Sequence, residues 1–502
     1  MRSILSAVLL RVLAGAGVLA VLLLTVACGG NSNSISGPGL GDTSNNSLLH
    51  GQYAFSFSGQ SRANGTLMSA VGMFTADGNG NITGGMEDAN IGNGSRTLNF
   101  TGKYSVGSDL RGTAILTGLP VCPNWQFAML NSSHALLTCF DTGNTASGSI
   151  DIQDPRAFSA AKLTGNYVFG ISGAGVGGGI SAMAGRWNMN GQGALSGEVD
   201  VNDTFTLAVD QSLTGTYTVN SNGRGTIAWN GPYGTQNFAF YIVNAGNLKI
   251  LESDTLSNTT PFNSGEALAQ ASAPYSLNTA NAGFAFTLGG NDPGFFAMAL
   301  GGVFSSNGAG TLSSVIDVND AGSTNLSFPS SGSYTISSTG RASLTINSGF
   351  FGLTLAAYPA ANGTWELVEM DGNGTTAGFA KLQTGSFSTT SVSGAYALNW
   401  TGTLDPLPTF NTNPSEEDIV GQLTADGAGN LGGTLDVNSF ANIIQGLPVS
   451  SSSYSMTGNG RGAASINTQA ATFNMQLYQV DANNVLFLDA DPTRVLVGLM
   501  QK

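Results

Sequence analysis

GRWNMNGQGALSGEVDVN, residues 185–202, contains the pattern from which the fold follows. Apolar residues alternate with polar or small ones on both sides of the turn Asn190-Gly191-Gln192-Gly193. Asn-Gly between two alternating runs predicts a β-hairpin, because the tight turns of hairpins need residues that adopt positive φ. Period two then places Asp200 and Asn202 on the strand face opposite to Leu195.

The Asp-x-Asn step at the end of this stretch recurs through the chain at intervals of 112, 117 and 119 residues. An arginine recurs with nearly the same pitch. A fixed period of this kind indicates tandem copies of one structural unit. The two markers are Asp88-Ala89-Asn90, Asp200-Val201-Asn202, Asp317-Val318-Asn319 and Asp436-Val437-Asn438, and Arg111, Arg224, Arg341 and Arg461.

One copy, residues 163–270, divides into about eight short alternating runs separated by Gly- and Asn-rich turns. No stretch after the leader has helical periodicity. Sequential hairpins favour an antiparallel meander, and eight strands suffice to close a small barrel. We therefore expect an all-β protein of four tandem antiparallel eight-stranded barrel-like repeats, with β-sandwich repeats as the alternative.

The order of the strands and the opening Gly165-x-Tyr167-x-Phe169 resemble, in topology, the avidin-like and lipocalin-like up-and-down barrels. This resemblance implies closed barrels and transfers no ligand-binding residue. We expect independent bodies joined by short linkers, with side-by-side packing also open. The expected units are a signal peptide 1–28, a disordered tether 29–48, and β repeats at 49–153, 163–270, 282–383 and 392–502.

The N-terminus reads as an export signal. Arg2 and Arg11 precede an apolar run, residues 12–27, that ends at Cys28. This run is shorter than the roughly 18–20 residues that span a bilayer, which favours a secretory signal over a permanent membrane helix. Residues 29–48, rich in Gly, Asn and Ser, are typical of a flexible tether.

Thr25-Val26-Ala27-Cys28, followed by Gly29-Gly30, resembles the lipobox of bacterial lipoproteins, although Thr25 replaces the usual leucine. The resemblance implies that Cys28 is lipidated and becomes the mature N-terminus, anchoring the chain to a membrane. In that family an aspartate after the cysteine retains proteins at the inner membrane. Gly29 therefore favours the outer membrane or cell surface, facing the periplasm or the exterior.

Two further cysteines, Cys122 and Cys139, remain for an oxidising compartment. A disulfide between them would enclose 16 residues and stabilise the first repeat by about 3 kcal/mol. Two reduced, buried thiols are the alternative. A metal site is not expected, because the chain contains only two histidines.

Charged residues make up 9% of the chain, against about 25% in ordinary globular proteins, and the net charge is −14. Nucleic acids and anionic membrane surfaces are bound through basic surfaces. The composition therefore argues against both as partners.

The four aspartates of the Asp-x-Asn steps allow two interpretations. Calcium takes six to eight oxygen ligands and could use these carboxylates beside glycine turns. We favour a side-chain bond to a neighbouring turn that fixes strand register, because most copies offer too few carboxylates for a calcium loop. No cofactor is therefore expected.

The four repeated arginines are interpreted as members of structural ion pairs. The seventh strand of each copy places acids on one face after two apolar residues, and semi-buried carboxylates require a countercharge. We expect each arginine to pair with the acids of its own repeat, namely Glu252 and Asp254, Glu369 and Asp371, Asp489 and Asp491, and Asp141 in the first copy.

No catalytic arrangement stands out, since His134 lies in an expected hairpin turn. Loops that differ between copies are the better place for a site. The fourth copy has an insertion, residues 404–419, that ends in Glu416-Glu417-Asp418, and these acids are the candidate loop site.

The sequence thus predicts a lipid-anchored envelope β-repeat protein with a structural, adhesive or ligand-binding role and a glycan or protein as partner. An envelope polysaccharide hydrolase and a carrier of small apolar ligands in a barrel calyx are the alternatives. Nothing in the sequence indicates an oligomeric state.

Overall fold

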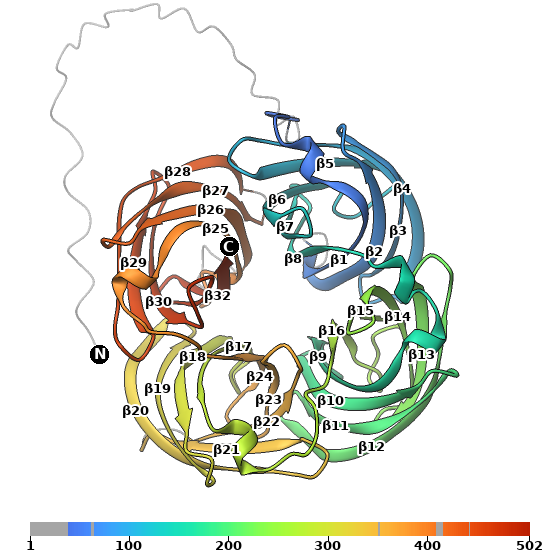
Figure 1. Cartoon of the computed structure of the whole chain (residues 1–502), viewed down its shortest axis with the longest axis vertical. Coiled ribbons are helices and arrows are strands. Elements are labelled where there is room, and N and C mark those ends of the chain that lie inside the picture. The colour runs from blue at the N-terminus through green and yellow to red at the C-terminus, as the bar shows by residue number, and fades with distance from the viewer. Residues whose placement is uncertain (1–38, 62–64, 350–351, 408–414, 441) are drawn as a thin grey trace, which may run out of the picture. The chain divides into compact units, whose positions relative to one another are not determined.

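The computed structural model describes residues 39–61, 65–349, 352–407, 415–440 and 442–502. The chain forms four closed antiparallel barrels of eight strands each, in which neighbours in sequence are neighbours in the sheet (Figure 1). The predicted fold class is confirmed, and the sandwich alternative is wrong because the first and eighth strands of every copy pair with each other. In the described part of the chain, no helix has the length and apolar character needed to cross a membrane.

Barrels 1 and 2 begin after short 3-10 turns. Barrel 1 follows η1 (Asn46–Leu48) and contains β1 (His50–Ser61), β2 (Thr66–Asp77), β3 (Asn81–Asn90), β4 (Arg96–Val106), β5 (Arg111–Thr117), β6 (Asn124–Asn131), β7 (His134–Phe140) and β8 (Asn144–Ile152). Barrel 2 follows η2 (Pro155–Ala157) and η3 (Ala160–Lys162) and contains β9 (Thr164–Ala174), β10 (Ile180–Asn190), β11 (Ala194–Asp203), β12 (Thr206–Val219), β13 (Arg224–Gly231), β14 (Gly234–Asn244), β15 (Asn247–Glu252) and β16 (Phe262–Ala269).

Barrels 3 and 4 repeat this order. Barrel 3 follows η4 (Leu277–Ala280) and contains β17 (Gly283–Asn291), β18 (Ala297–Ser306), β19 (Thr311–Asp320), β20 (Ser323–Ile336), β21 (Ala342–Asn347), β22 (Gly352–Pro359), β23 (Thr364–Glu369) and β24 (Thr375–Leu382). Barrel 4 follows η5 (Thr389–Ser391) and contains β25 (Ser393–Leu404), β26 (Ser415–Asp426), β27 (Asn430–Ser439), β28 (Asn442–Met456), β29 (Arg461–Asn467), β30 (Thr472–Gln479), β31 (Asn484–Asp489) and β32 (Arg494–Gln501).

The turn between β10 and β11 shows why the Asn-Gly motif recurs. Asn190 Oδ1 accepts the backbone N–H groups of Gln192 at 2.8 Å and Ala194 at 3.0 Å. Gly191 and Gly193 adopt φ of 76° and 96°, a region that residues with a Cβ rarely occupy. The same bonds are made at the equivalent turns by Asp77, Asn307 and Asp426.

Each barrel has its own apolar interior, in which aliphatic side chains surround several aromatic rings. In barrel 2, the rings of Phe169 and Trp187 stack with centroids 4.5 Å apart, and Trp229 packs against both. A repeated tyrosine closes one end of every barrel: the Tyr217 hydroxyl donates to the Leu163 carbonyl at 2.9 Å. Its counterparts in the other barrels are Tyr104, Tyr334 and Tyr454.

The barrels also pack against one another, so the expectation of independent bodies is wrong. Outward-facing apolar residues form four buried clusters, which join barrel 1 to 2, 2 to 3, 3 to 4 and 4 to 1. The contacts therefore form a closed cycle. Sheets do not run from barrel to barrel: among the described residues, only the isolated bridges Asn93↔Thr255 and Gln270↔Ala360 cross a junction.

The Asp-x-Asn aspartate of one barrel pairs with the repeated arginine of the next. Asp200 on β11 has no solvent exposure and accepts two bonds from the Arg341 guanidinium of barrel 3, at 2.6 and 2.7 Å. The Tyr358 hydroxyl of barrel 3 donates a third, at 2.5 Å. A fourth comes from within barrel 2, from the backbone N–H of Asp210 in the adjacent strand bulge. These bonds provide the charge and hydrogen bonding that a buried carboxylate requires.

The other junctions are built in the same way. Arg224 and Tyr241 bind Asp88, and Arg461 and Tyr478 bind Asp317. Arg111 binds Asp436 of the last barrel through one nitrogen, at 2.9 Å to both oxygens.

The asparagine two residues on faces the same way and completes each junction. Asn202 Nδ2 donates to the carbonyls of Glu369 and Gly374 in barrel 3, at 2.8 and 2.9 Å. Asn90, Asn319 and Asn438 bind equivalent carbonyls of the barrel that follows them in the cycle. We call the Arg–Asp and Asn–carbonyl contacts together the inter-barrel clamp.

The predicted partner of the arginines is therefore wrong. Arg224 lies opposite Tyr241, which lies opposite Lys249, so these three side chains point out of barrel 2. Glu252 lies opposite Phe238, whose ring is part of the core, and so points inward. The arginine and the seventh-strand acid are on opposite faces of the sheet and cannot meet.

The last residues of the expected tether belong to the first barrel. The Asn45 backbone N–H donates to the Val106 carbonyl at 2.9 Å, and the Val106 N–H donates to the Asn46 side chain at 2.7 Å. Asp42 accepts from the Ser108 N–H at 2.8 Å. The disordered-tether interpretation does not hold for this part.

We expect Arg341→Met to lower the free energy of unfolding by about 3–5 kcal/mol, because it leaves Asp200 buried without its countercharge. Urea unfolding followed by tryptophan fluorescence measures the change. Arg156→Met is the matched control, since the Arg156 side chain is 89% exposed in its pair with Asp154, and its midpoint should equal that of the wild type. An unchanged midpoint for Arg341→Met would show that the clamp is not stabilising.

Candidate functional site

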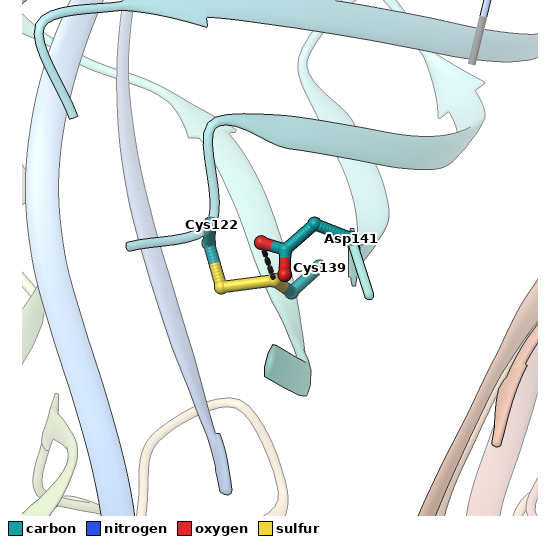
Figure 2. Close-up of side chains that lie close together, drawn as sticks. All are labelled: Cys122, Cys139 and Asp141. Carbon is teal, nitrogen blue, oxygen red and sulfur yellow. Dashed lines mark hydrogen bonds between the residues drawn. A yellow bond between two sulfur atoms is a disulfide. The ribbon is translucent and has the colours of Figure 1, made fainter. Parts of the chain in front are cut away.

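Cys122 and Cys139 form a disulfide at one end of barrel 1, with Cα atoms 5.4 Å apart (Figure 2). Both residues are fully buried. Asp141 Oδ2 lies 3.6 Å from the Cys139 sulfur. These three residues are the only group of three or more His, Cys, Asp or Glu side chains, within the described ranges, whose ligand atoms converge. Because both sulfurs are bonded to each other, the group is not a metal site.

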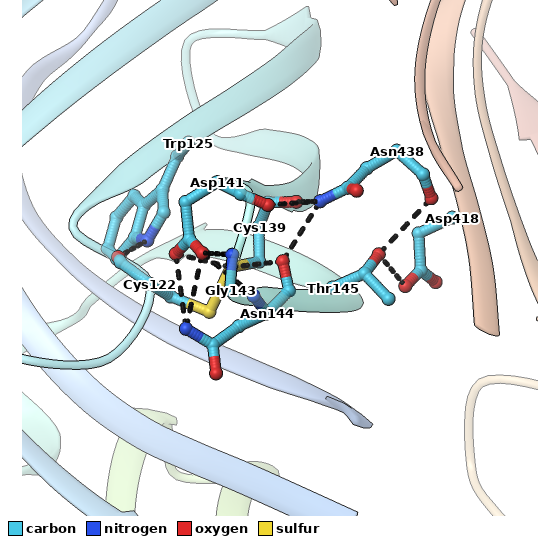
Figure 3. The surroundings of a disulfide bond; sticks show 9 residues. All are labelled: Cys122, Trp125, Cys139, Asp141, Gly143, Asn144, Thr145, Asp418 and Asn438. Atoms are coloured by element: carbon cyan, nitrogen blue, oxygen red, sulfur yellow. Dashed lines mark hydrogen bonds between the residues drawn. A yellow bond between two sulfur atoms is a disulfide. The ribbon is translucent and has the colours of Figure 1, made fainter. Parts of the chain in front are cut away.

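The disulfide fastens the segment of barrel 1 that barrel 4 contacts (Figure 3). Asn438 Nδ2 donates to the carbonyls of Cys139, Asp141 and Asn144 at 2.9, 3.2 and 3.0 Å. The Asp141 carboxylate caps the same turn by accepting the N–H groups of Gly143 and Asn144. This disulfide is therefore a structural element of the junction between the first and last barrels.

The candidate loop acids are divided between separate contacts. Asp418 accepts the hydroxyls of Thr145 and Ser147 in barrel 1, both at 2.6 Å, and burial raises its pKa to about 6. Glu417 binds Arg494 at 2.7 Å within barrel 4. Burial, with Asp418 nearby, raises the pKa of Glu416, which lines a 470 Å³ cavity beside the β1–β2, β9–β10 and β25–β26 hairpins. Two of the three acids thus make structural contacts.

Cys28, the candidate lipidation site, lies outside the described residues.

A cavity of 470 Å³ opens into the interior of barrel 3, at the end opposite to Tyr334. Its volume is within the usual range of small-molecule sites, about 300–1,000 Å³. Aliphatic, thioether and aromatic side chains form much of its wall, namely Met298, Leu300, Val318, Phe328 and Leu353.

Four polar side chains complete the wall: Asp320, Asn325, Glu369 and Asn373. Glu369 is 1% exposed and accepts the Thr376 hydroxyl at 2.7 Å. Burial raises its pKa to about 8, and Asp371 adds to the shift. Burial, with Asp292 nearby, also raises the pKa of Asp320, whose Oδ1 has no hydrogen-bond partner among the described residues. Near neutral pH, Glu369 is therefore mostly protonated and can donate a hydrogen bond.

At the corresponding ends of the other barrels, the described residues make different contacts. In barrel 2, Trp229 donates to Gln236, which donates to Glu252, at 3.0 and 2.8 Å. In barrel 4, the Arg494 guanidinium lies 4.9 Å from the centre of the Phe473 ring. In barrel 1, the disulfide occupies this place, and Trp125 Nε1 donates to the Cys122 carbonyl.

The sequence placed Glu369 among the acids on one face of the seventh strand, but it did not predict a cavity beside this residue. Where barrel 4 has Phe473, barrel 3 has Leu353 at the equivalent position of its sixth strand. At this position barrel 2 has Gln236 and barrel 1 has Pro123. Only one copy has an aromatic residue at this position, so a comparison of the copies gives no signal for a cavity in barrel 3.

No protein-family model matches the chain, and no curated protein matches it either. Among solved structures, a double mutant of the vaccine antigen transferrin binding protein B from Haemophilus parasuis Hp5 is similar over 74% of this chain and 82% of its own, with 11% identity and a TM-score of 0.18. At that TM-score, the similarity supports no statement about function.

We expect the protein to be more stable near pH 5 than near pH 8.5. Burial raises the pKa values of Glu252, Glu369 and Asp489 to about 8 each. Between the ordinary carboxyl pKa and about 8, the folded state therefore holds protons that the unfolded state has released, and stability falls as pH rises through that window. Thermal unfolding across this range measures the slope.

The control is the triple variant Glu252→Gln, Glu369→Gln and Asp489→Asn, which removes three of the raised titrations and should make the profile less steep; Glu87, whose pKa burial also raises to about 8, still titrates in it. A melting temperature of the wild type that rises from pH 5 to pH 8.5 would show that these acids are ionised in the folded protein.

Proposed function

We propose that the protein is a lipid-anchored binding protein of the bacterial outer membrane or cell surface, which holds a small, largely apolar ligand in the third barrel. The leader that ends in Cys28 supports the anchor. The cavity in barrel 3, with its mostly apolar wall and a few polar groups, supports the binding role. Packing inside a protein is normally close, so a hollow of this size needs a reason.

The wall of the cavity defines the ligand. Leu300, Val318 and Leu353 favour an aliphatic or aromatic body that removes apolar surface from water. Protonated Glu369 favours one hydrogen-bond acceptor on the ligand, such as a carbonyl oxygen. A ligand anion would lie beside the carboxyl groups of Glu369 and Asp320 and is disfavoured.

The neutral fluorophore N-phenyl-1-naphthylamine should bind the intact protein with increased emission. Leu353→Trp fills the cavity and should weaken this binding by at least about tenfold, equivalent to the loss of a few buried CH₂ contacts. Val318→Phe, which fills less volume, should weaken it to a smaller extent. Fluorescence titration measures both effects, and circular dichroism verifies that the variants remain folded.

Leu382→Trp is the matched control, because Leu382 is 38% exposed on the same barrel and does not line the cavity. It should bind the probe as the wild type does. Equal binding by wild type and both cavity variants would contradict a site in barrel 3.

The anchor is tested separately. In cells that process lipoproteins, the protein should partition into the detergent phase on Triton X-114 extraction, because an acyl chain buries many CH₂ groups. Cys28→Ala should move it to the aqueous phase or leave an unprocessed precursor. A wild-type protein found only in the aqueous phase would remove the lipid anchor from the proposal, whatever the result for the cavity.

A further inference from the structure

A second cavity, of 370 Å³, lies where barrels 1, 2 and 3 meet. Its wall comes from the outward faces of β1, β8, β9, β15, β16, β23 and β24, and small residues predominate in it. Ser58 and Ser172, both on this wall, are exposed side chains within it. This junction cavity is separate from the site in barrel 3 and shares no lining residue with it.

Glu366 is the unusual residue of the junction cavity. It stands on β23 at the position that Leu136, Lys249 and Leu486 occupy on the seventh strands of the other barrels. In barrels 1 and 4, the leucine at this position packs against the neighbouring barrel. An acidic side chain is therefore not required for the contact between barrels. Glu366 is nevertheless 6% exposed, and no hydrogen bond joins its carboxyl to another described residue.

Lys249 lines the same cavity but is fully partnered. Its ammonium binds Asp151 and Ser149 of barrel 1, both at 2.7 Å, and Asp151 also binds His134. The contrast with Glu366 shows that this fold can satisfy a charged group at that position. Glu366 has no such partner among the described residues, and its side chain lines the cavity instead.

The Glu366 carboxyl lies against Gly170 of β9. A Cβ at Gly170 would overlap the end of the Glu366 side chain, which would have to shift. Glu266 lies opposite Gly170 in the β9–β16 pair, which brings a second carboxyl beside the first. Phe379 forms part of the apolar wall, and the Lys381 ammonium lies 5.5 Å from the centre of its ring.

We propose that the junction cavity binds a small neutral polyol, a mono- or disaccharide, through Glu366, Glu266 and the hydroxyls of Ser58 and Ser172, with Phe379 against its apolar face. Hydroxyl groups both donate and accept hydrogen bonds, as do serine side chains and a protonated carboxyl. Burial raises the pKa of Glu366 well above its ordinary value, with Glu266 adding to the shift and Lys381 opposing it. The protonated acid is thus suited to a ligand hydroxyl.

Charge balance favours a neutral ligand over an ion. Lys249 is neutralised by Asp151, and Lys381 offsets Glu266, so little net charge faces the cavity. A ligand cation would approach the Lys249 ammonium, which lines the cavity. A ligand anion would face both carboxyls.

The test is isothermal titration of the intact protein with glucose, galactose, N-acetylglucosamine, maltose and trehalose. At least one should bind. Ser172→Trp blocks the cavity and should weaken that binding at least about tenfold, while Ser333→Trp, on the exposed face of β20, should leave it unchanged. Glu366→Gln keeps a group that donates and accepts, so binding should fall by only about threefold, whereas Glu366→Leu removes both functions and should cost about tenfold.

Three outcomes would overturn the proposal: none of the sugars binds, Ser172→Trp binds as tightly as the wild type, or Glu366→Gln abolishes binding as Glu366→Leu does. The last result would show that binding requires a carboxylate, and putrescine and Ca²⁺ titrated in parallel would then test the cavity as a cation site. Thermal unfolding of each variant separates a lost site from a lost fold.

Discussion

A carboxylate without any solvent exposure, held by the next barrel, is the contact on which the architecture depends. Removing a carboxylate from water is unfavourable by several kcal/mol, and only close charge pairing and complete hydrogen bonding offset that. Asp200 meets this requirement with an arginine and a tyrosine from barrel 3 and an N–H from its own barrel. The same aspartate therefore fixes the fourth-strand bulge within one barrel and the position of another barrel.

This constraint explains which parts of the repeats are alike and which differ. The clamp residues face outward and must match a neighbour, so the aspartate, asparagine and arginine recur in all four copies. Over the residues that the structure describes, the side chains on the inner face of each barrel contact no neighbouring barrel, so they do not have to match a partner. Among the described residues, the end of the barrel interior holds a disulfide in barrel 1, the Trp229–Gln236–Glu252 chain in barrel 2, Arg494 in barrel 4 and a cavity in barrel 3. Repetition of the frame thus leaves each interior free to acquire its own chemistry.

Much of this could be predicted from sequence, because period two and turn chemistry are local. The strands, the tandem barrels and the shared face of Asp200 and Asn202 all follow from residues close together in the chain. The partner of Arg224 could not be found in the same way. Alternation shows which face of a strand a side chain occupies, but not which barrel lies against that face. Assuming a partner within the repeat led to Glu252, which points to the other side of the sheet.

Glu366 shows a different limit. In its own repeat it is an acid in an alternating strand and attracts no notice. Only alignment with Leu136, Lys249 and Leu486 reveals an acid at a position used for packing, and only the structure shows that its neighbour across the junction is Gly170. The information is in the sequence, but it becomes readable when the copies are compared position by position.

The junction between the last and first barrels differs from the others because no linker joins these two barrels directly. In this clamp, Ala128 stands where the other clamps have a tyrosine. Its arginine, Arg111, also pairs with Asp109 in addition to Asp436. The loss is offset by contacts special to this junction. Asp418 binds Thr145 and Ser147, Gln422 binds the Met129 carbonyl, and the disulfide holds the segment that Asn438 contacts. The first and last barrels are far apart in the chain, so holding them together costs the conformational entropy of closing a long loop. The contacts at this junction must offset that cost, because no linker connects the two barrels. Asp418 of the fourth copy and the two cysteines of the first copy therefore both stabilise the contact that closes the cycle.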